Sequence, residues 1–213
     1  MNDDLACLMY LLAHDPAAHG PYDRSRTELL VRTAALIDLA VRGRLQEGRG
    51  GSVMVSGSAP TGDLVLDGVL RDAGAGHGWK RLARRHRKQS LSQVEDQLTA
   101  AGVLTVMSPR TRLGTRRVTV NDPAVLTALR ARVSAALHGR GPVGALPVAD
   151  AALLALAAAG GLRSVVSRRD LTTFRARIDA CTGQLATVAP GLEKAVRTLP
   201  TTMIAAHGGM GGS

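Results

Sequence analysis

The chain has very few aromatic side chains: phenylalanine, tryptophan and tyrosine make up 2% of its residues, although 45% of the residues are hydrophobic. A core built from alanine, leucine and valine favours closely packed helices, and the apolar fraction excludes a disordered basic protein. Lysine is scarce as well, because the 27 basic residues include only three lysines. The 213 residues therefore predict a folded protein of one or two domains.

Cysteines and long apolar runs are also limited. Cys7 and Cys181 stand far apart within apolar segments, which predicts two reduced core thiols rather than a disulfide. Asp3 and Asp4 precede the first short apolar run, so we expect no signal peptide. The longest nearly uncharged apolar run, Val148–Ala159, is too short to span a bilayer. The sequence therefore predicts a soluble cytoplasmic protein.

Recognisable catalytic and metal-binding patterns are lacking too. Gly57 and Gly62 have the spacing of a phosphate-binding loop, but Asp63 stands where that loop requires lysine and would repel phosphate. The six histidines show no metal-ligand spacing with acids or cysteines, and no pair of carboxylates stands out for acid–base catalysis. We therefore expect no catalytic residue, no metal and no cofactor, and we predict that the protein is not an enzyme.

Positive charge, in contrast, is concentrated between Lys80 and Val120. This stretch holds ten basic residues and two acids, so it carries eight of the chain's ten net positive charges. The bases form two clusters: Lys80, Arg81, Arg84, Arg85, Arg87 and Lys88, then Arg110, Arg112, Arg116 and Arg117. Clustered base raises the local potential enough to concentrate an anionic partner, and a merely solvated helix face is the structural alternative.

The candidate partners of this charge are membrane headgroups, nucleic acid and an acidic protein. Binding of single-stranded nucleic acid normally adds stacking aromatic side chains, and only Trp79 lies near the bases. Binding of duplex DNA through its phosphates alone stays open. A membrane surface requires positive charge and something apolar to insert, which Leu113 supplies weakly in the second cluster.

Apolar spacing predicts a largely helical chain. Leu5–Leu12 is expected to form a first helix, and a second helix, capped by Thr27, keeps one apolar face as far as Val41. Asp63 is placed to begin a third helix, where an acid complements the helix dipole.

The first basic cluster itself has helical spacing. One apolar stripe is formed by Trp79, Leu82, Ala83 and His86. The arginines point elsewhere, so the stripe predicts a short basic amphipathic helix. Overlapping capping boxes that begin at Ser90 and Ser92 predict the start of a further helix.

The second half of the chain has clear helix signals. Asp122 before Pro123 predicts a helix start, Val148–Ala159 is apolar on all sides as in an enclosed helix, and Pro190 begins a last amphipathic stretch. No linker divides residues 1–206, and the glycine-rich residues 207–213 are predicted as a flexible tail. The fold class is therefore expected to be mostly α: a single-domain helical bundle with surrounding amphipathic helices and one or two small β-hairpins.

Two predicted hairpins each follow a helix. Val53–Val55 alternates after a polar turn, and Val103–Met107 and Val118–Val120 flank the arginine-rich loop. A helix followed by a hairpin is also typical of winged-helix domains. This repetition keeps a nucleic-acid-binding regulator open as an alternative that would use the same arginines.

Three segments, in this order and spacing, resemble the Golgi phosphoprotein 3 family, including its bacterial members. They are Leu36–Gln46 (LIDLAVRGRLQ), Ala59–Asp67 (APTGDLVLD) and Ala101–Thr105 (AGVLT). The Ala-Leu-rich segment Asp150–Val166 also matches a late central helix of the family. The resemblance implies a mostly helical fold with a protruding β-hairpin. It also implies a peripheral membrane protein without enzymatic activity, since eukaryotic members bind phosphatidylinositol 4-phosphate on a basic face.

The resemblance also implies site residues. The family's pocket uses a tryptophan, whose position falls near Asp23, and an arginine that falls on Arg32. Two further arginines of the pocket fall on Lys88 and Leu91. The expected phosphate-binding residues are Arg32, Arg84, Arg85, Arg87 and Lys88, and the expected membrane-facing hairpin residues are Arg110, Arg112, Leu113, Arg116 and Arg117.

Together these observations predict a peripheral protein at the cytoplasmic face of a membrane, binding anionic phospholipid headgroups as a membrane-associated adaptor. Arg32 and Lys88 are expected to converge on one surface near Ser90 with the neighbouring arginines. The alternatives are a winged-helix-like nucleic-acid-binding regulator and an adaptor that docks an acidic protein.

Overall fold

The computed structural model of the chain describes residues 4–57, 59–107 and 116–208, the side chains of 204–208 excepted. It is 64% helical, which confirms the predicted mostly α fold class. The helices are α1 (Leu5–Leu12), α2 (Arg24–Val41), α3 (Leu64–Ala73), α4 (Trp79–Arg84), α5 (Arg87–Ala100), α6 (Pro123–His138), α7 (Val148–Ala159), α8 (Arg168–Thr173), α9 (Arg175–Gln184), α10 (Pro190–Arg197) and α11 (Leu199–Gly208). The strands are β1 (His14–Asp15), β2 (Gly20–Pro21), β3 (Leu45–Glu47), β4 (Val53–Val55), β5 (Leu104–Met107) and β6 (Arg117–Val120).

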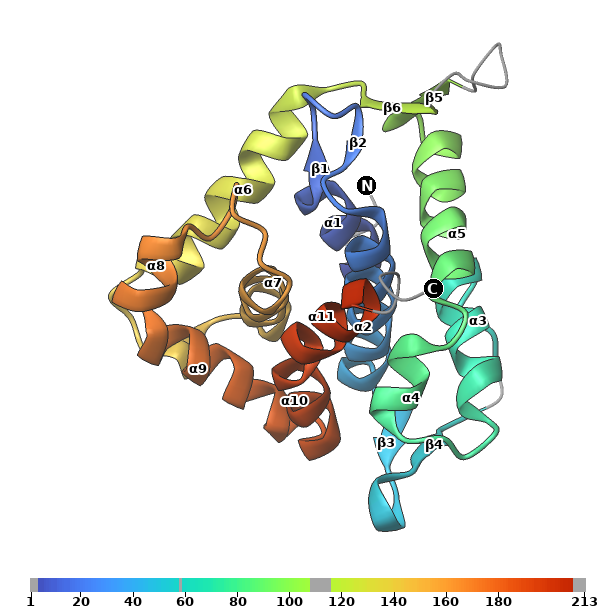
Figure 1. Cartoon of the computed structure of the whole chain (residues 1–213). Coiled ribbons are helices and arrows are strands. Elements are labelled where there is room, and N and C mark those ends of the chain that lie inside the picture. The colour runs from blue at the N-terminus through green and yellow to red at the C-terminus, as the bar shows by residue number, and fades with distance from the viewer. Residues whose placement is uncertain (1–3, 58, 108–115, 209–213) are drawn as a thin grey trace.

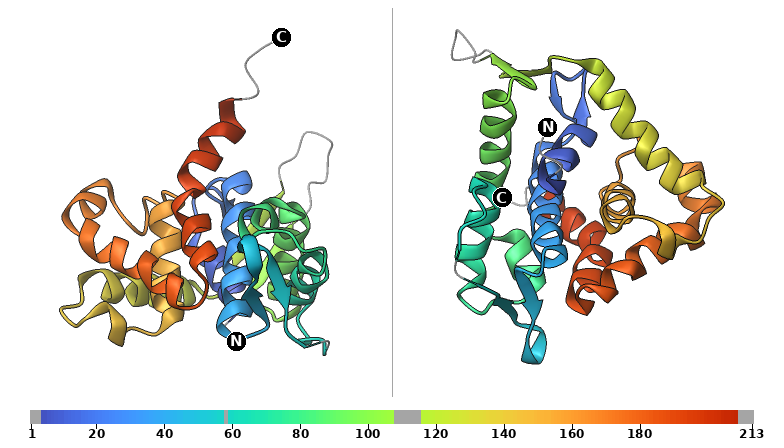
Figure 2. Two further views of the ribbon diagram at one scale, coloured as in Figure 1. Left: turned by 90° about the horizontal axis from the view of Figure 1, so that it is seen from below. Right: turned by 180° about the vertical axis from the view of Figure 1, so that it is seen from behind.

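Helix α2 lies in the middle of the molecule. Helices α3, α4 and α5 lie on one side of it, and α6, α7, α8 and α9 lie on the other (Figure 1; Figure 2, right). Every residue from Thr27 to Ala40 is buried, so helices surround most of its length. The helix begins three residues before the predicted cap at Thr27, because the Asp23 side chain accepts a hydrogen bond from the Arg26 N–H and takes the capping role. The Thr27 hydroxyl instead donates to the Asp23 carbonyl.

Helix α7 is enclosed, as its all-round apolar sequence predicts. Its bounds, Val148–Ala159, are those expected, and it contacts α1, α2, α6 and α9. One contiguous hydrophobic cluster runs through the molecule from Leu5 in α1 to Met203 in α11. Aliphatic side chains make up most of this cluster, which explains how the chain packs with so few aromatic residues.

Three two-stranded antiparallel sheets are present in the described residues. The two predicted hairpins are confirmed: β3 pairs with β4, and β5 pairs with β6 with Val106 opposite Val118. The β1–β2 pair was not predicted from the sequence, since each strand has only two residues and too little pattern to detect. It packs on the second hairpin, where the Val118 N–H donates to the His19 carbonyl at 2.7 Å. In the predicted tail, α11 includes residues 207 and 208, and 209–213 lie outside the described residues.

Both cysteines are free and buried, which confirms the predicted reduced core thiols. Burial, followed by the nearby carboxylates of Asp4, Asp63 and Asp38, raises the pKa of Cys7 from 9.0 to about 12. Each factor disfavours the thiolate, which is the reactive form of cysteine. Cys7 is therefore protonated and unreactive in the folded protein at neutral pH.

We expect Cys7 to react with a thiol reagent near neutral pH far more slowly in the native than in the denatured protein. Because its pKa is raised on folding, its contribution to stability is fully present below about pH 9 and is lost as the pH rises through the folded pKa of about 12. The free energy of unfolding, measured against pH, should fall less steeply above about pH 9 in Cys7→Ala than in the parent chain. Rapid labelling of Cys7 in the native state, measured by mass spectrometry, contradicts this expectation.

Candidate anion-binding site

The face of α2 toward α5 carries three charged residues at four-residue spacing: Arg24, Glu28 and Arg32, here called the α2 charge row. Residues at this spacing lie on one side of a helix. Each of them has a partner in α5: Arg24 Nη1 lies 2.9 Å from Glu95 Oε1, Glu28 Oε2 lies 3.4 Å from Arg87 Nε, and Arg32 Nη1 donates to Ser90 Oγ at 3.1 Å. The charge row therefore fixes α2 against the basic part of the sequence.

Arg32 is almost completely buried, with 1% of its surface exposed. Its guanidinium donates to three different helices: Nε to the Leu82 carbonyl of α4 at 3.2 Å, Nη1 to Ser90 of α5 and Nη2 to the Asp72 carboxylate of α3. Burial lowers the pKa of Arg32, and the ion pair with Asp72 opposes that effect. A buried guanidinium with three satisfied donors holds α3, α4 and α5 around α2.

The Asp72 carboxylate contacts nitrogen atoms of three side chains. Besides Arg32, it accepts from Nδ1 of His86 at 2.9 Å and lies 3.6 Å from Nε of Arg85. Its side chain is 10% exposed, whereas those of Arg85 and His86 are 41% and 49% exposed. Asp72 thus joins a buried arginine to two groups at the surface.

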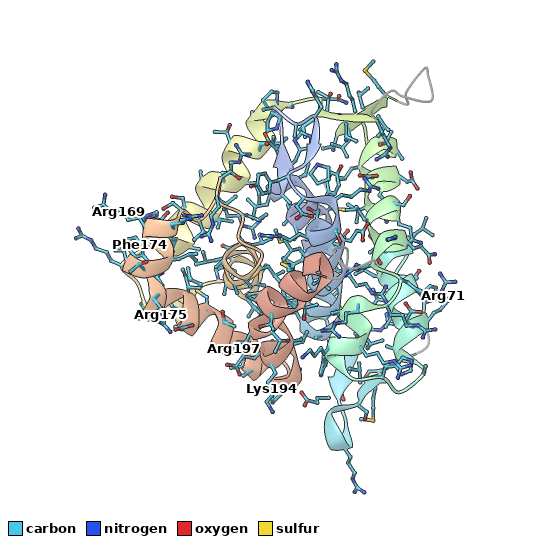
Figure 3. The ribbon with its side chains drawn as sticks, in the orientation of Figure 1. Arg71, Arg169, Phe174, Arg175, Lys194 and Arg197 are labelled. Atoms are coloured by element: carbon cyan, nitrogen blue, oxygen red, sulfur yellow. The ribbon has the colours of Figure 1, made fainter. Side chains whose placement is uncertain are left out.

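A small polar hollow of about 140 Å³ opens between α2, α3 and α5. Its lining residues are Arg32, Gly68, Arg71, Asp72, His86, Gln89, Ser90 and Gln93. Arg71 extends outward from α3 at the edge of the molecule (Figure 3). The first turn of α5 borders the hollow, and the first N–H groups of a helix have no intrahelical acceptor and favour anions. We call this hollow the Arg32 pocket.

The structure separates the five predicted phosphate-binding residues. Arg32 and Arg85 meet at Asp72, and Ser90 in the first turn of α5 reaches Arg32. The other three point elsewhere: Arg84 donates to the Thr202 hydroxyl of α11 at 3.0 Å, Arg87 turns inward to Glu28, and Lys88 is exposed with no ion pair or hydrogen bond to any described residue.

Of the five predicted hairpin residues, the structure describes Arg116 and Arg117. Arg110, Arg112 and Leu113 lie outside the described residues. Arg116 pairs inward, with Nη1 2.6 Å from Glu95 Oε2, and Arg117 is exposed at the start of β6. Glu95 is buried and also accepts from the Tyr10 hydroxyl at 3.1 Å and from Arg24. We call Glu95, Tyr10, Arg24 and Arg116 the Glu95 cluster.

The chain between α4 and α5 departs from the predicted pattern. The stripe expected to include His86 ends earlier, because Arg85 is extended and His86 is left-handed with a φ of 49°, so the helical period is interrupted and His86 is exposed. The helix predicted to start at Ser90 starts at Arg87. Ser90 does not cap it, since its hydroxyl accepts from Arg32 instead.

Several residues of the Arg32 pocket were not predicted from the sequence. Arg71 and Asp72 are adjacent charges near the end of α3 and resemble ordinary surface residues. Gln89 and Gln93 are uncharged and lie one turn apart on α5. The available signal was the α2 charge row itself, because charges at four-residue spacing in a helix flanked by apolar residues require buried partners.

Two of the segments that carry the resemblance, Leu36–Gln46 and Ala59–Asp67, contact each other. Arg44, from the Arg-Gly-Arg-Leu word, donates from Nε to the Ser56 carbonyl at 3.0 Å and from Nη2 to the Ala59 carbonyl at 2.5 Å. In the Pro-Thr-Gly-Asp word, Asp63 caps α3 by accepting from the Val65 and Leu66 N–H groups. These contacts thus position the start of α3, the helix that carries Arg71 and Asp72.

The helix-then-hairpin repetition is real, as α2 precedes β3–β4 and α5 precedes β5–β6. Helix α2 is buried along most of its length and has no face free to enter a DNA groove. The exposed positions of α5 beyond its first turn include Ser92, Asp96 and Thr99, which carry no positive charge. This arrangement gives the winged-helix alternative no support.

These features define a helical protein with a small polar pocket on its surface, lined in part by Arg32 and Arg71. In the part of the chain that the structure describes, no helix is long and apolar enough to cross a membrane. The chain belongs to the Golgi phosphoprotein 3 (GPP34) family, whose sequence model matches residues 5–199, and this confirms the resemblance found in the sequence. Comparison with curated proteins gave no match. Family membership is consistent with a non-enzymatic, lipid-binding adaptor.

Proposed function

We propose that the protein is a non-enzymatic peripheral membrane adaptor that binds the phosphate groups of anionic phospholipids at the Arg32 pocket, on the cytoplasmic face of a membrane. The observation that carries this proposal is the pocket itself. It gathers Arg32 and Arg71 in one hollow with Gln89 and Ser90 from the first turn of α5, and α5 belongs to the stretch of chain that holds most of the net charge. Backbone N–H groups, helix dipole and side-chain charge all favour an anion there.

Exposed bases around the pocket supply a less specific attraction. Lys80, Arg81 and Lys88 are exposed on α4 and α5, and both helices contact α3. Each basic residue near an anionic membrane contributes about 1 kcal/mol, so these three together give roughly 3 kcal/mol. Added salt shortens the range of this electrostatic attraction. Binding is therefore expected to depend on surface charge before it depends on headgroup identity.

Replacing Arg71 and Lys88 by serine should weaken flotation with anionic vesicles by about thirtyfold, since two bases contribute roughly 2 kcal/mol. The matched control is a double variant, Arg169→Ser with Arg175→Ser. Both arginines are exposed and lie on the side of the molecule opposite Arg71 (Figure 3). The control removes the same net charge and should retain more of the binding. Both variants should keep the parent melting temperature, because exposed substitutions usually change stability by less than about 0.5 kcal/mol.

The same assay separates the alternatives. Binding of the parent chain should rise with the fraction of anionic lipid and fall as salt is raised, and equal binding to neutral vesicles at high salt contradicts the proposal. Retention of duplex DNA at matched salt, without flotation, identifies a nucleic-acid-binding protein instead. If the protein neither floats with vesicles nor retains duplex DNA, the alternative that stays open is an adaptor that docks an acidic protein.

A further inference from the structure

We propose that Asp72 is an internal competitor for the ligand of the Arg32 pocket, and that it excludes anions with a single negative charge. This inference rests on the proposed function and adds a specificity-determining residue to it. Asp72 is the one acid among the residues that line the described pocket. Its carboxylate already engages the nitrogen atoms of Arg32, Arg85 and His86, which an entering phosphate would otherwise contact.

The position of Asp72 in its helix supports a role outside helix stability. It is the second-last residue of α3, where the negative end of the helix dipole disfavours an acid. Arg71, its neighbour, is the type of residue that this position favours. Asp72 is held instead by its ion pairs, and the buried guanidinium of Arg32 is the partner that most requires it.

A phosphate oxygen and the Asp72 carboxylate compete for the same N–H donors. A phosphodiester brings one negative charge, equal to that of the carboxylate it must displace, so the exchange gains little. A phosphomonoester carries about −1.5 to −2 at neutral pH and presents three oxygens, so it gains additional charge-assisted hydrogen bonds from Arg71 and the first turn of α5. The pocket is thereby selective for phosphomonoester groups over phosphodiesters.

The test compares Asp72→Asn with the parent chain on two vesicle types of matched surface potential. One contains phosphatidic acid, a phosphomonoester, and the other phosphatidylglycerol, a phosphodiester. The parent should prefer phosphatidic acid, and Asp72→Asn should bind phosphatidylglycerol at least about tenfold more tightly and lose the preference. The matched control is Asp150→Asn, which removes an acid paired with Arg132 at 2.5 Å and makes the same change of net charge outside the pocket. It should leave the preference unchanged.

Stability provides a second measurement, because Asp72→Asn leaves Arg32 without its buried counter-ion. Inorganic phosphate should raise the melting temperature of Asp72→Asn more than those of the parent and Asp150→Asn, or restore its fold if the variant is unfolded alone. An unfolded variant that phosphate does not restore overturns the inference. So does a folded variant with parent-like binding, when the parent binds anionic vesicles; in that case the proposed function stands. Failure of parent and variant alike to bind either vesicle overturns both.

Discussion

Replacing Arg32 by alanine is expected to lower the free energy of unfolding by about 3 to 5 kcal/mol, the cost of breaking a buried ion pair from one side. The substitution leaves the Asp72 carboxylate, the Ser90 hydroxyl and the Leu82 carbonyl without their shared donor. It also creates a cavity where three helices meet α2. Urea unfolding followed by circular dichroism measures the loss.

Two controls show whether the loss comes from this network. Arg32→Lys keeps the charge but cannot donate to three helices in fixed directions, so most of the loss should remain. Arg175→Ala removes an arginine whose side chain is 83% exposed and should change stability by less than about 0.5 kcal/mol. A loss below about 1 kcal/mol in Arg32→Ala would contradict the structural role given to Arg32.

Replacing Gly191 by alanine should destabilise the protein by about 3 kcal/mol, at the upper end of the usual cost of overpacking. A Cβ at this position would lie 2.2 Å from Cδ1 of Trp79 and 3.0 Å from Oε2 of Glu47. Trp79 is only 2% exposed and cannot move outward, and the Gly191 N–H donates to the same Glu47 oxygen at 2.6 Å. The close approach of α10 to α4 therefore requires glycine.

Gly183→Ala is the matched control for this substitution. Gly183 lies in α9, and nothing approaches within 4 Å of the position that a Cβ would take. Alanine has the higher helix propensity, so this variant should gain about 0.5 to 1 kcal/mol. Thermal unfolding of both variants measures the contrast, and equal melting temperatures would show that α10 does not pack against Trp79 as described.

Much of the fold could be predicted because its signals are local. Asp122 with Pro123 marks the start of α6, and the all-round apolar segment gave both bounds of α7. Errors arose where tertiary contacts override local preference. Ser90 has the sequence context of a helix cap, but its hydroxyl bonds Arg32, 58 positions earlier. The left-handed backbone of His86 likewise has no local signal, since glycine is the usual residue there.

The site was less predictable because its charges are matched across helices. The sequence predicts positive charge around Lys80–Lys88, but not which bases are already neutralised. Arg87 pairs with Glu28 and Arg116 pairs with Glu95. Nothing in the sequence predicts which base each of these acids contacts. Asp72 is adjacent to a base in the sequence, yet its partner in space is Arg32. Only the packing of α3 and α5 against α2 determines these pairs.

The α2 charge row sets a fixed length between two parts of the molecule. Arg24 in the Glu95 cluster and Arg32 in the Arg32 pocket are eight residues apart on one buried helix, about 12 Å at 1.5 Å per residue. Arg117 directly follows Arg116 of the Glu95 cluster in the chain, and Arg71 lines the Arg32 pocket. A charged surface that touches both Arg117 and Arg71 meets them at a constant separation. Once one of these arginines is in contact with the surface, the other therefore binds at a high effective concentration. Such a two-point attachment responds to the spacing of charges on the surface as well as to their total number.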